Sequence, residues 1–311
     1  MRILLLGANG QLGRSFIIDG GLAARGELVT ASRDGRGFDG AAVEAADLAA
    51  PESLPGLLDR LRPDAIVNAA AYTAVDRAEQ EEALATSVNG EAVGVLGRWA
   101  AEHDALVVHY STDYVFDGAA TAPYPVDAPT APLGAYGRSK LAGERALRES
   151  GAAHFVFRTA WVYAPHGNNF LRTMLRVGAE RDELRVVADQ VGAPTSTALI
   201  VAGTLAVLDA WRAADAAQRR ALIGTHHLVA SGRTSWHGFA TAIFDEAHAR
   251  GLLARKPRVT AIATADYPTP ARRPAWSVLD NSGFQQRFGY ALPDWQAGLH
   301  GVLDALTRQA H

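Results

Sequence analysis

The chain has 311 residues, of which 48% are hydrophobic and 20% charged, an ordinary globular composition with enough apolar material for a large core. It contains no cysteine, which excludes disulfides, thiolate catalysis and cysteine-ligated metal centres. The formal net charge of -3 gives no general attraction to nucleic acid or to an anionic membrane, and apolar runs such as residues 2–6 and 65–71 fall well short of the roughly 20 residues that cross a bilayer. We therefore expect a cytoplasmic protein with a small-molecule partner and with no nucleic-acid or membrane partner.

The first half of the chain alternates short apolar runs with amphipathic segments. Buried strands are predicted at residues 2–6, 27–31, 65–69, 106–111 and 154–158. Helices are predicted at residues 11–23, 51–61, 81–103 and 139–149. This alternation predicts an α/β fold with a doubly wound, Rossmann-like parallel sheet that has helices on both faces.

The pattern changes after residue 160. Turn-rich segments at 165–169 and 189–196 precede an alanine- and leucine-rich helix at about 196–214, which we expect to return to the sheet. A strand at 225–230, a helix at 236–250 and a proline- and arginine-rich segment at 267–274 follow. We expect a dinucleotide-binding domain of residues 1–160 and about 197–224, and a smaller, mostly C-terminal substrate lobe of about 161–196 and 225–311.

A glycine-rich turn follows the first predicted strand. Gly7, Gly10 and Gly13 stand at three-residue spacing immediately before the first predicted helix. Such a turn brings backbone N–H groups and the positive end of a helix against a pyrophosphate, where a Cβ atom would obstruct the approach. The context predicts a dinucleotide site, although a plain strand-to-helix turn is the structural alternative.

The end of the second predicted strand bears on the choice of cofactor. Ser32 and Arg33 stand where many NAD enzymes have an acidic residue for the adenosine ribose. A guanidinium at this place favours a 2′-phosphate, so we expect NADPH. Asp34 follows directly and leaves NADH as a second accepted cofactor.

A Tyr-x-x-x-Lys unit, Tyr136 to Lys140, lies at the predicted helix of residues 139–149. Residues four apart share one helix face, so the ammonium group lies beside the phenol and favours its ionised form. Tyr136 is then the expected general acid of a reduction. Thr112 follows the fourth of the first-half strands, at the edge where such sheets bind ligands, and its hydroxyl is placed to stabilise a developing alkoxide.

The order of the glycine turn, Thr112, Tyr136 and Lys140 resembles the extended short-chain dehydrogenase/reductase family. Within it, the chain is similar to the dTDP-4-dehydrorhamnose reductase family. The matching segments are NAAAYTAVDRAE (68–79), HYSTDYVFDG (109–118), YGRSKLAGE (136–144), RTAWVYAPHGNNF (158–170), DQVGAPTS (189–196) and YPTPARRP (267–274). They span nearly the whole chain.

The resemblance implies hydride transfer from NADPH to C4 of dTDP-4-dehydro-L-rhamnose, a nucleotide-sugar substrate, in dTDP-rhamnose biosynthesis. It implies a cofactor site of Gly7, Asn9, Gly10, Gln11, Leu12, Gly13, Ser32, Arg33, Asp47, Leu48, Ala69, Ala70, Ala71, Tyr136 and Lys140. By the same resemblance, Asp47 and Leu48 are expected to contact the adenine, and Asn68 and the small residues after it are expected to form a wall of the cofactor site. The implied substrate site is Thr112, Asp113, Tyr114, Trp161, Asn168, Asn169, Gln190 and Arg273. Arg273, with Arg272 beside it, is expected to neutralise the diphosphate.

One departure concerns a divalent cation that family members hold at a dimer interface through acidic side chains. The corresponding segments here read Arg14-Ser15 and Ser196-Thr197-Ala198 and lack carboxylates, so we expect no metal site. The homodimer implied by the family is left open for the same reason. The adjacent His226 and His227 point to opposite faces of a strand, and with His237 they are expected to be structural rather than zinc ligands.

Two alternatives stay open at this point. One is a nucleotide-sugar epimerase or dehydratase that retains NAD, which Ser32 and Arg33 disfavour. The other is a noncatalytic dinucleotide-binding regulatory subunit, such as the methionine adenosyltransferase beta subunit, which the intact Thr112, Tyr136 and Lys140 disfavour.

Overall fold

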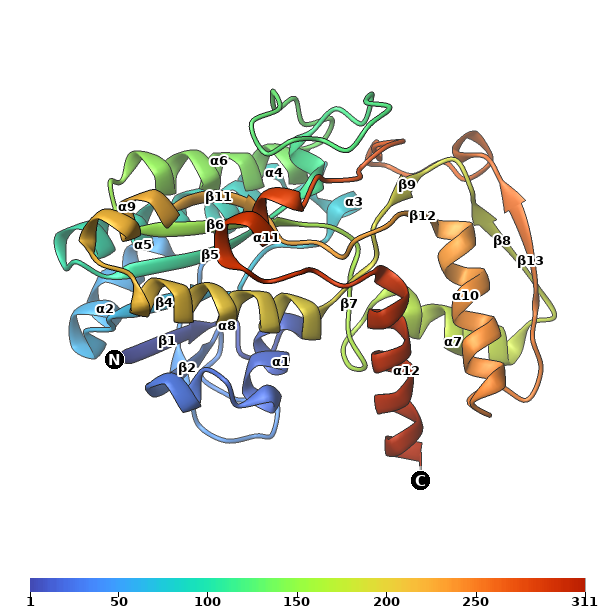
Figure 1. Cartoon of the computed structure of the whole chain (residues 1–311), viewed down its shortest axis with the longest axis horizontal. Helices are drawn as coiled ribbons and strands as arrows, with labels where there is room; N and C mark the ends of the chain where they lie inside the picture. The colour runs from blue at the N-terminus through green and yellow to red at the C-terminus, as the bar shows by residue number, and fades with distance from the viewer. Residues whose placement is uncertain (311) are drawn as a thin grey trace.

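A seven-stranded parallel sheet forms the centre of the computed structural model, which describes residues 1–310 (Figure 1). Its strands, in spatial order, are β11 (Gly224–His227), β6 (His154–Thr159), β5 (Leu106–Thr112), β4 (Ala65–Asn68), β1 (Arg2–Leu6), β2 (Glu27–Ser32) and β3 (Glu44–Ala45). The order reverses between β1 and β4, which is the point where doubly wound sheets bind their ligands. The predicted doubly wound, Rossmann-like α/β fold is confirmed.

Helices cover both faces of this sheet because successive strand residues point to opposite sides. Ile3 and Leu5 pack with α1 (Gln11–Asp19) and α8 (Thr197–Ala213), whereas Leu4 and Leu6 pack with α2 (Leu54–Leu61) and α5 (Ala92–Glu102). Helix α6 (Ala135–Glu149) lies against α5. The remaining helices of this part are α3 (Val75–Ala78), α4 (Glu82–Thr86) and α9 (Ala216–Leu222), with 3-10 turns at Ala23–Arg25, Pro51–Ser53 and Asp113–Val115.

Two predicted helices differ in detail from those observed. Helix α6 begins at Ala135, four residues before the predicted start, so Tyr136 lies inside its first turn. The predicted helix of 81–103 is interrupted between α4 and α5 by a π-helical turn at Ser87–Glu91. The turn directs Asn89 inward, where its side chain bonds the backbone N–H and C=O of Tyr72 at 2.9 and 3.0 Å and the Ser139 hydroxyl at 3.0 Å. Such bulges are frequent at functional sites.

A second group of elements lies beyond one end of the sheet (Figure 1). It contains α7 (Phe170–Glu180), α10 (Trp236–Ala249) and the parallel pair β8 (Glu183–Val187) and β13 (Arg258–Ile262). The short strands are β7 (Val162–Tyr163), β9 (Val191–Gly192), β10 (Thr195–Ser196) and β12 (Thr234–Ser235). A 3-10 turn at Thr264–Asp266 and helices α11 (Ser282–Phe288) and α12 (Trp295–Ala310) complete the described chain.

Strand β11 bears on the expected division of the chain. The sequence placed the strand at 225–230 in the smaller lobe, but β11 pairs in parallel with β6 and is an edge strand of the central sheet. The physical reason is that α8 and α9 return the chain beside β6, as a right-handed crossover does. The two-lobe division stays a prediction, with β11 counted with the sheet.

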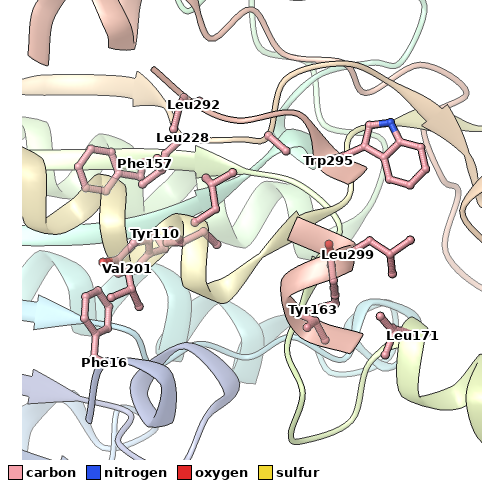
Figure 2. Packing of buried hydrophobic residues seen from close by; sticks show 14 of the residues in the cluster. Phe16, Tyr110, Phe157, Tyr163, Leu171, Val201, Leu228, Leu292, Trp295 and Leu299 are labelled. Carbon is pink, nitrogen blue, oxygen red and sulfur yellow. The ribbon is translucent and has the colours of Figure 1, made fainter. Parts of the chain in front are cut away.

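One apolar core connects the two parts. Figure 2 shows Phe16, Tyr110 and Phe157 beside the sheet, with Tyr163 and Trp295 further along the same cluster. Most of these rings are at most 1% exposed, and Tyr110 and Trp295 are both 7% exposed. Within residues 1–310 there is no helix that combines the length and the hydropathy needed to span a bilayer.

Candidate active site

The glycine turn after β1 has no room for side chains. Gly7 adopts φ +81°, and a Cβ atom there would lie 2.6 Å from the backbone nitrogen of Ala70. A Cβ on Gly13 would lie 2.1 Å from the carbonyl oxygen of Gly7, and one on Gly10 would lie 3.3 Å from the same oxygen. The turn therefore holds β1, the start of α1 and the end of β4 in close backbone contact, as a pyrophosphate cradle requires.

A cavity of about 440 Å³ opens beside this turn. Nine of the predicted cofactor residues line it: Gly7, Asn9, Gly10, Ser32, Arg33, Asp47, Leu48, Ala70 and Ala71. The lining also includes Asp34, which the sequence linked to NADH, and residues that the sequence did not single out as cofactor contacts: Ala46, Ala49, Tyr72, Arg77, Glu81, Leu84 and Val88. The cavity thus lies along the carboxyl ends of β1, β2 and β4.

The loop after β2 presents Arg33 to the cavity and bonds Asp34 internally. Ser32 is buried and donates its hydroxyl to Asp34 Oδ1 at 3.0 Å, and the backbone N–H of Arg36 donates to the same carboxylate and to Ser32 Oγ. These hydrogen bonds lower the pKa of Asp34, with the Ser32 bond as the largest cause. Arg33 is exposed and lines the cavity.

Three further predicted cofactor residues lie around the turn without lining the cavity. The Gln11 carbonyl accepts a hydrogen bond from Ser15 and lies 3.0 Å from His166 Nε2, and its Oε1 accepts one from Asn169 at 2.8 Å. Leu12 and Ala69 are partly buried and pack against the main core.

The catalytic residues predicted from the sequence come together at the carboxyl end of β5 and the start of α6. Thr112 is the last residue of β5, and its hydroxyl lies near enough to the Tyr136 phenol to lower the pKa of that phenol. The Tyr114 ring meets the Tyr136 ring edge-on at 5.6 Å between centroids. Burial, and after it the nearby Asp113 carboxylate, raises the pKa of Tyr136 to about 12.

Lys140 lies one turn further along α6 and is 1% exposed. Burial lowers its pKa to about 7, while the charge of Glu144 acts in the opposite direction. Burial is the largest influence on the pKa of both groups in this geometry. A phenol of raised pKa keeps its proton at neutral pH, which suits a general acid.

A buried ion pair lies under this end of α6. Arg158 on β6 bonds both oxygens of Glu144, at 3.0 and 2.7 Å, and the Ser111 hydroxyl bonds Glu144 Oε1 at 2.5 Å. Arg158 and Glu144 are 5% and 2% exposed. Paired in this way, both charges are tolerated in the interior, and they tie α6 to β5 and β6.

Asp113 and Tyr114 follow Thr112 directly. Asp113 is buried and accepts the Thr112 hydroxyl at 2.9 Å, and burial raises its pKa to about 6. Burial also raises the pKa of Tyr114, whose surroundings include Arg273 and Asp76. Both side chains thus lie beside Tyr136, where a substrate role was predicted.

Four predicted substrate residues lie in the segment 161–196, which the sequence assigns to the smaller lobe. Trp161 adopts φ +48° and stacks on Trp236 with 3.5 Å between ring centroids. Asn168 is exposed, whereas the Asn169 side chain caps α7 and bonds the carbonyls of Ala164 and His166 as well as Gln11. Gln190 is 5% exposed and bonds the Thr264 hydroxyl at 3.1 Å. The hydrogen-bonding groups of Asn169 are therefore directed to the protein itself.

Arg273 forms an ion pair that the sequence did not reveal. Its Nη2 lies 2.9 Å from Asp76 on α3, and Asp76 also accepts the backbone N–H of Ala271. The pair joins the 271–273 segment to the helix after the cofactor wall. Asp76 lies within the family-like segment 68–79 without having been singled out there, and Asn89 belongs to no local motif.

Several side chains at the positions considered for metals form hydrogen bonds within the protein. Ser15 donates to Thr197 Oγ1 at 2.8 Å, joining α1 to α8 where the family's carboxylates were looked for. His226 and His227 bond the carbonyls of Leu222 and Asp280, and burial lowers the pKa of each to about 4. His237 lies 3.3 Å from the Val259 carbonyl. Among residues 1–310, no three histidine, aspartate or glutamate side chains are grouped as a metal would need.

Comparisons with known proteins find relatives that match nearly the whole chain. The family model described as RmlD substrate binding domain matches residues 1–308. A dTDP-4-dehydrorhamnose reductase of Burkholderia thailandensis is 48% identical over 95% of this chain and 96% of its own length. Among solved structures, a dTDP-4-dehydrorhamnose reductase from Clostridium acetobutylicum has a TM-score of 0.86 at 34% identity, covering 98% of this chain and 99% of its own. Another, from Bacillus anthracis in complex with NADP, has a TM-score of 0.83 at 30% identity with the same coverage. The chain belongs to the dTDP-4-dehydrorhamnose reductase family.

Proposed function

We propose that this protein uses NADPH to reduce the C4 ketone of dTDP-4-dehydro-L-rhamnose to dTDP-L-rhamnose, with NADH as a second accepted cofactor. The observation that carries the proposal is the grouping of Thr112, Tyr136 and Lys140 at the carboxyl edge of the sheet, beside the glycine turn and its cavity. Membership of the reductase family supports the identity of the substrate.

The residues present fit a dinucleotide. The glycine turn is a cradle that a single Cβ atom would fill, and the cavity beside it continues to Asp47 and Leu48. In the proposal the turn holds the pyrophosphate, Asp47 and Leu48 contact the adenine, and Arg33 binds the 2′-phosphate. When bound, NADPH supplies the hydride that is added to C4.

Side chains of the protein carry out the proton transfer that accompanies the reduction. Tyr136 donates its phenolic proton to the ketone oxygen as that oxygen gains charge, and the nearby Thr112 hydroxyl stabilises the same oxygen. Lys140 holds the nicotinamide ribose and provides a titratable group one helical turn from the phenol.

We assign the sugar to the space beside Asp113, Tyr114 and Trp161, and the diphosphate to Arg273. Tyr114 already lies edge-on against Tyr136, which places an aromatic surface next to the reacting carbon. Arg273 keeps one guanidinium nitrogen on Asp76 and retains others for a phosphate oxygen. Asn168 and Gln190 are assigned as further contacts at the rim.

We also propose a cytoplasmic location, where NADPH and nucleotide-linked sugars are available. Ser15 and Thr197 hydrogen-bond each other within one chain, so the proposal includes no metal-bridged dimer.

The proposal is tested by mixing the purified protein with NADPH and freshly generated dTDP-4-dehydro-L-rhamnose. We expect loss of NADPH absorbance with dTDP-L-rhamnose as product. A folded protein that binds NADPH but leaves this ketone unreduced contradicts the substrate and retains the reductase chemistry.

A further inference from the structure

His109 is a fully buried histidine behind the catalytic helix that the proposed mechanism does not use. It lies on β5, three residues before Thr112, and is 0% exposed. Its Nε2 lies 3.3 Å from Lys140 Nζ, and its Nδ1 lies 3.2 Å from Asn68 Nδ2. Asn68 and Lys140 are each 1% exposed, so the contacts between these three side chains are sheltered from water.

The orientation of the Asn68 amide is fixed by the backbone. The N–H of Ala70 can only donate, and it donates to Asn68 Oδ1 at 3.2 Å. The other amide atom, which faces His109, is therefore the NH₂ group, and it donates to Nδ1 of the imidazole. A neutral imidazole that accepts at Nδ1 carries its hydrogen on Nε2.

This tautomer determines what Lys140 meets. The Nε2–H of His109 points at Nζ, and only an uncharged amine has a lone pair to accept it. The other charged or titratable groups facing Lys140 are Glu144 one turn along α6, with its partner Arg158 on β6, and Tyr136 one turn back. His109 is the one among them in direct side-chain contact with Nζ.

We propose that His109 is a positioning residue for Lys140. The chain from Ala70 through Asn68 sets the His109 tautomer, and His109 in turn holds Nζ in place and favours the uncharged amine. Burial lowers the pKa of Lys140, which is the same direction as the effect proposed for His109. In its ammonium form, an amine that titrates near neutral pH can pass a proton to the Tyr136 oxygen after the phenol has protonated the ketone. An N–H bond of the ammonium breaks, the O–H bond re-forms, and the neutral amine that remains takes up a new proton from solvent. Only this last consequence rests on the proposed function.

The sequence offers a direct measurement because the chain has two lysines, Lys140 and Lys256. Lys256 is exposed and paired with Asp245, so it serves as an internal reference. In protein labelled with ¹³C at the lysine ε-carbon, the two signals can be titrated separately by NMR without substrate or cofactor.

We expect Lys140 to titrate well below Lys256 in the unaltered protein. In His109→Phe, which removes the donor but keeps a buried ring, the Lys140 midpoint should rise by about 0.5 to 1 pH unit, since loss of a hydrogen bond to the neutral form favours the charged one. Asn68→Asp should raise it as well, because a carboxylate accepts from Nδ1–H and turns the Nε2 lone pair toward Lys140. Lys256 should not move in either variant.

The matched control is His154→Phe, at a buried histidine whose ring nitrogen contacts the Ala152 carbonyl. It should leave the Lys140 midpoint unchanged. His109→Gln keeps a polar group near Nζ and provides a folded variant if the phenylalanine is not accommodated; its Lys140 midpoint should lie between those of the unaltered protein and Asn68→Asp.

Midpoints of Lys140 that stay unchanged or fall in the His109 and Asn68 variants overturn the inference. Failure to reduce the ketosugar bears on the proposed function alone, because the titration needs no turnover. With turnover, the pH profile of kcat should shift in the His109 variants in the same direction as the Lys140 midpoint, whereas a purely structural role would lower kcat equally at every pH.

Discussion

The central sheet and the turns beyond its end use their polar side chains differently. Around the sheet, Ser32, Arg33 and Asp47 follow strand ends and line one cavity with the glycine turn. In the turns beyond it, Asn169 and Gln190 direct hydrogen bonds to Gln11 and Thr264 within the protein. The difference indicates that a motif at a parallel strand end faces the cavity because the backbone directs it there, whereas a polar residue in a turn first satisfies its neighbours.

The largest effect is expected from Tyr136→Phe, which tests the general acid assigned at the carboxyl edge of the sheet. Turnover should fall about 100-fold or more, because the positioned acid is lost, while NADPH affinity stays near its original value. Initial rates and NADPH binding measured on the same preparation check this. Tyr290→Phe, at a partly buried tyrosine outside the site, should retain full turnover. Unaltered turnover in Tyr136→Phe contradicts the assignment.

Gly13→Ala tests the close packing of the turn. The new Cβ atom would lie 2.1 Å from the Gly7 carbonyl oxygen, so the start of α1 must shift and NADPH affinity should fall about 30-fold or more. Gly56→Ala is the control, because a Cβ there meets nothing within 4 Å and α2 should gain about 0.5 kcal/mol. Equal NADPH affinity in both variants would show that the glycine turn does not bind the cofactor.

Asp113→Asn tests how much stability the protein loses by burying an ionised carboxylate at this site. The pKa of Asp113 is raised from 3.8 to about 6 on folding, so its contribution to stability is fully present below pH 4 and is lost as the pH rises through 6. The variant should therefore gain about 2 kcal/mol on the unaltered protein between pH 4 and pH 7. Urea unfolding of both proteins across this range measures the difference. A difference that does not change with pH contradicts the buried ionisation.

Arg33→Ala tests the choice of cofactor. Affinity for NADPH should fall about 10-fold and that for NADH should change little, because only NADPH carries the 2′-phosphate. Arg36→Ala, in the same loop but outside the cavity lining, should affect neither. Equal losses for the two cofactors in Arg33→Ala would show that Arg33 does not bind that phosphate.

The smallest effects are expected from alanine substitutions at the neighbouring residues Asn168 and Asn169. Asn169→Ala should weaken NADPH about 3-fold through the released Gln11 and lower stability by about 1 kcal/mol through the lost cap of α7, with little change in the KM of the ketosugar. Asn168→Ala should leave stability unchanged because its side chain is exposed. If only the KM of the ketosugar rose in Asn169→Ala, that result would show that Asn169 contacts the substrate.

Much of the sheet and cofactor site was predictable because its signals are local. Apolar runs mark β1, β4 and β5, and the glycine spacing marks the turn. Other features depend on contacts distant in the sequence. The placement of β11 beside β6, the Asp76 contact with Arg273 and the burial of Lys140 arise only when separate segments pack together. The π-helical turn at Asn89 could not be predicted, because the sequence pattern of residues 81–103 is that of one continuous helix.

The central claim is tested most directly by NADPH that carries deuterium in the transferable position at C4 of its nicotinamide. With dTDP-4-dehydro-L-rhamnose, we predict one NADPH oxidised per dTDP-L-rhamnose formed, with the deuterium at C4 of the sugar by mass spectrometry and NMR. A converted sugar without deuterium, formed with no consumption of NADPH, would contradict the account and favour an enzyme that retains its cofactor.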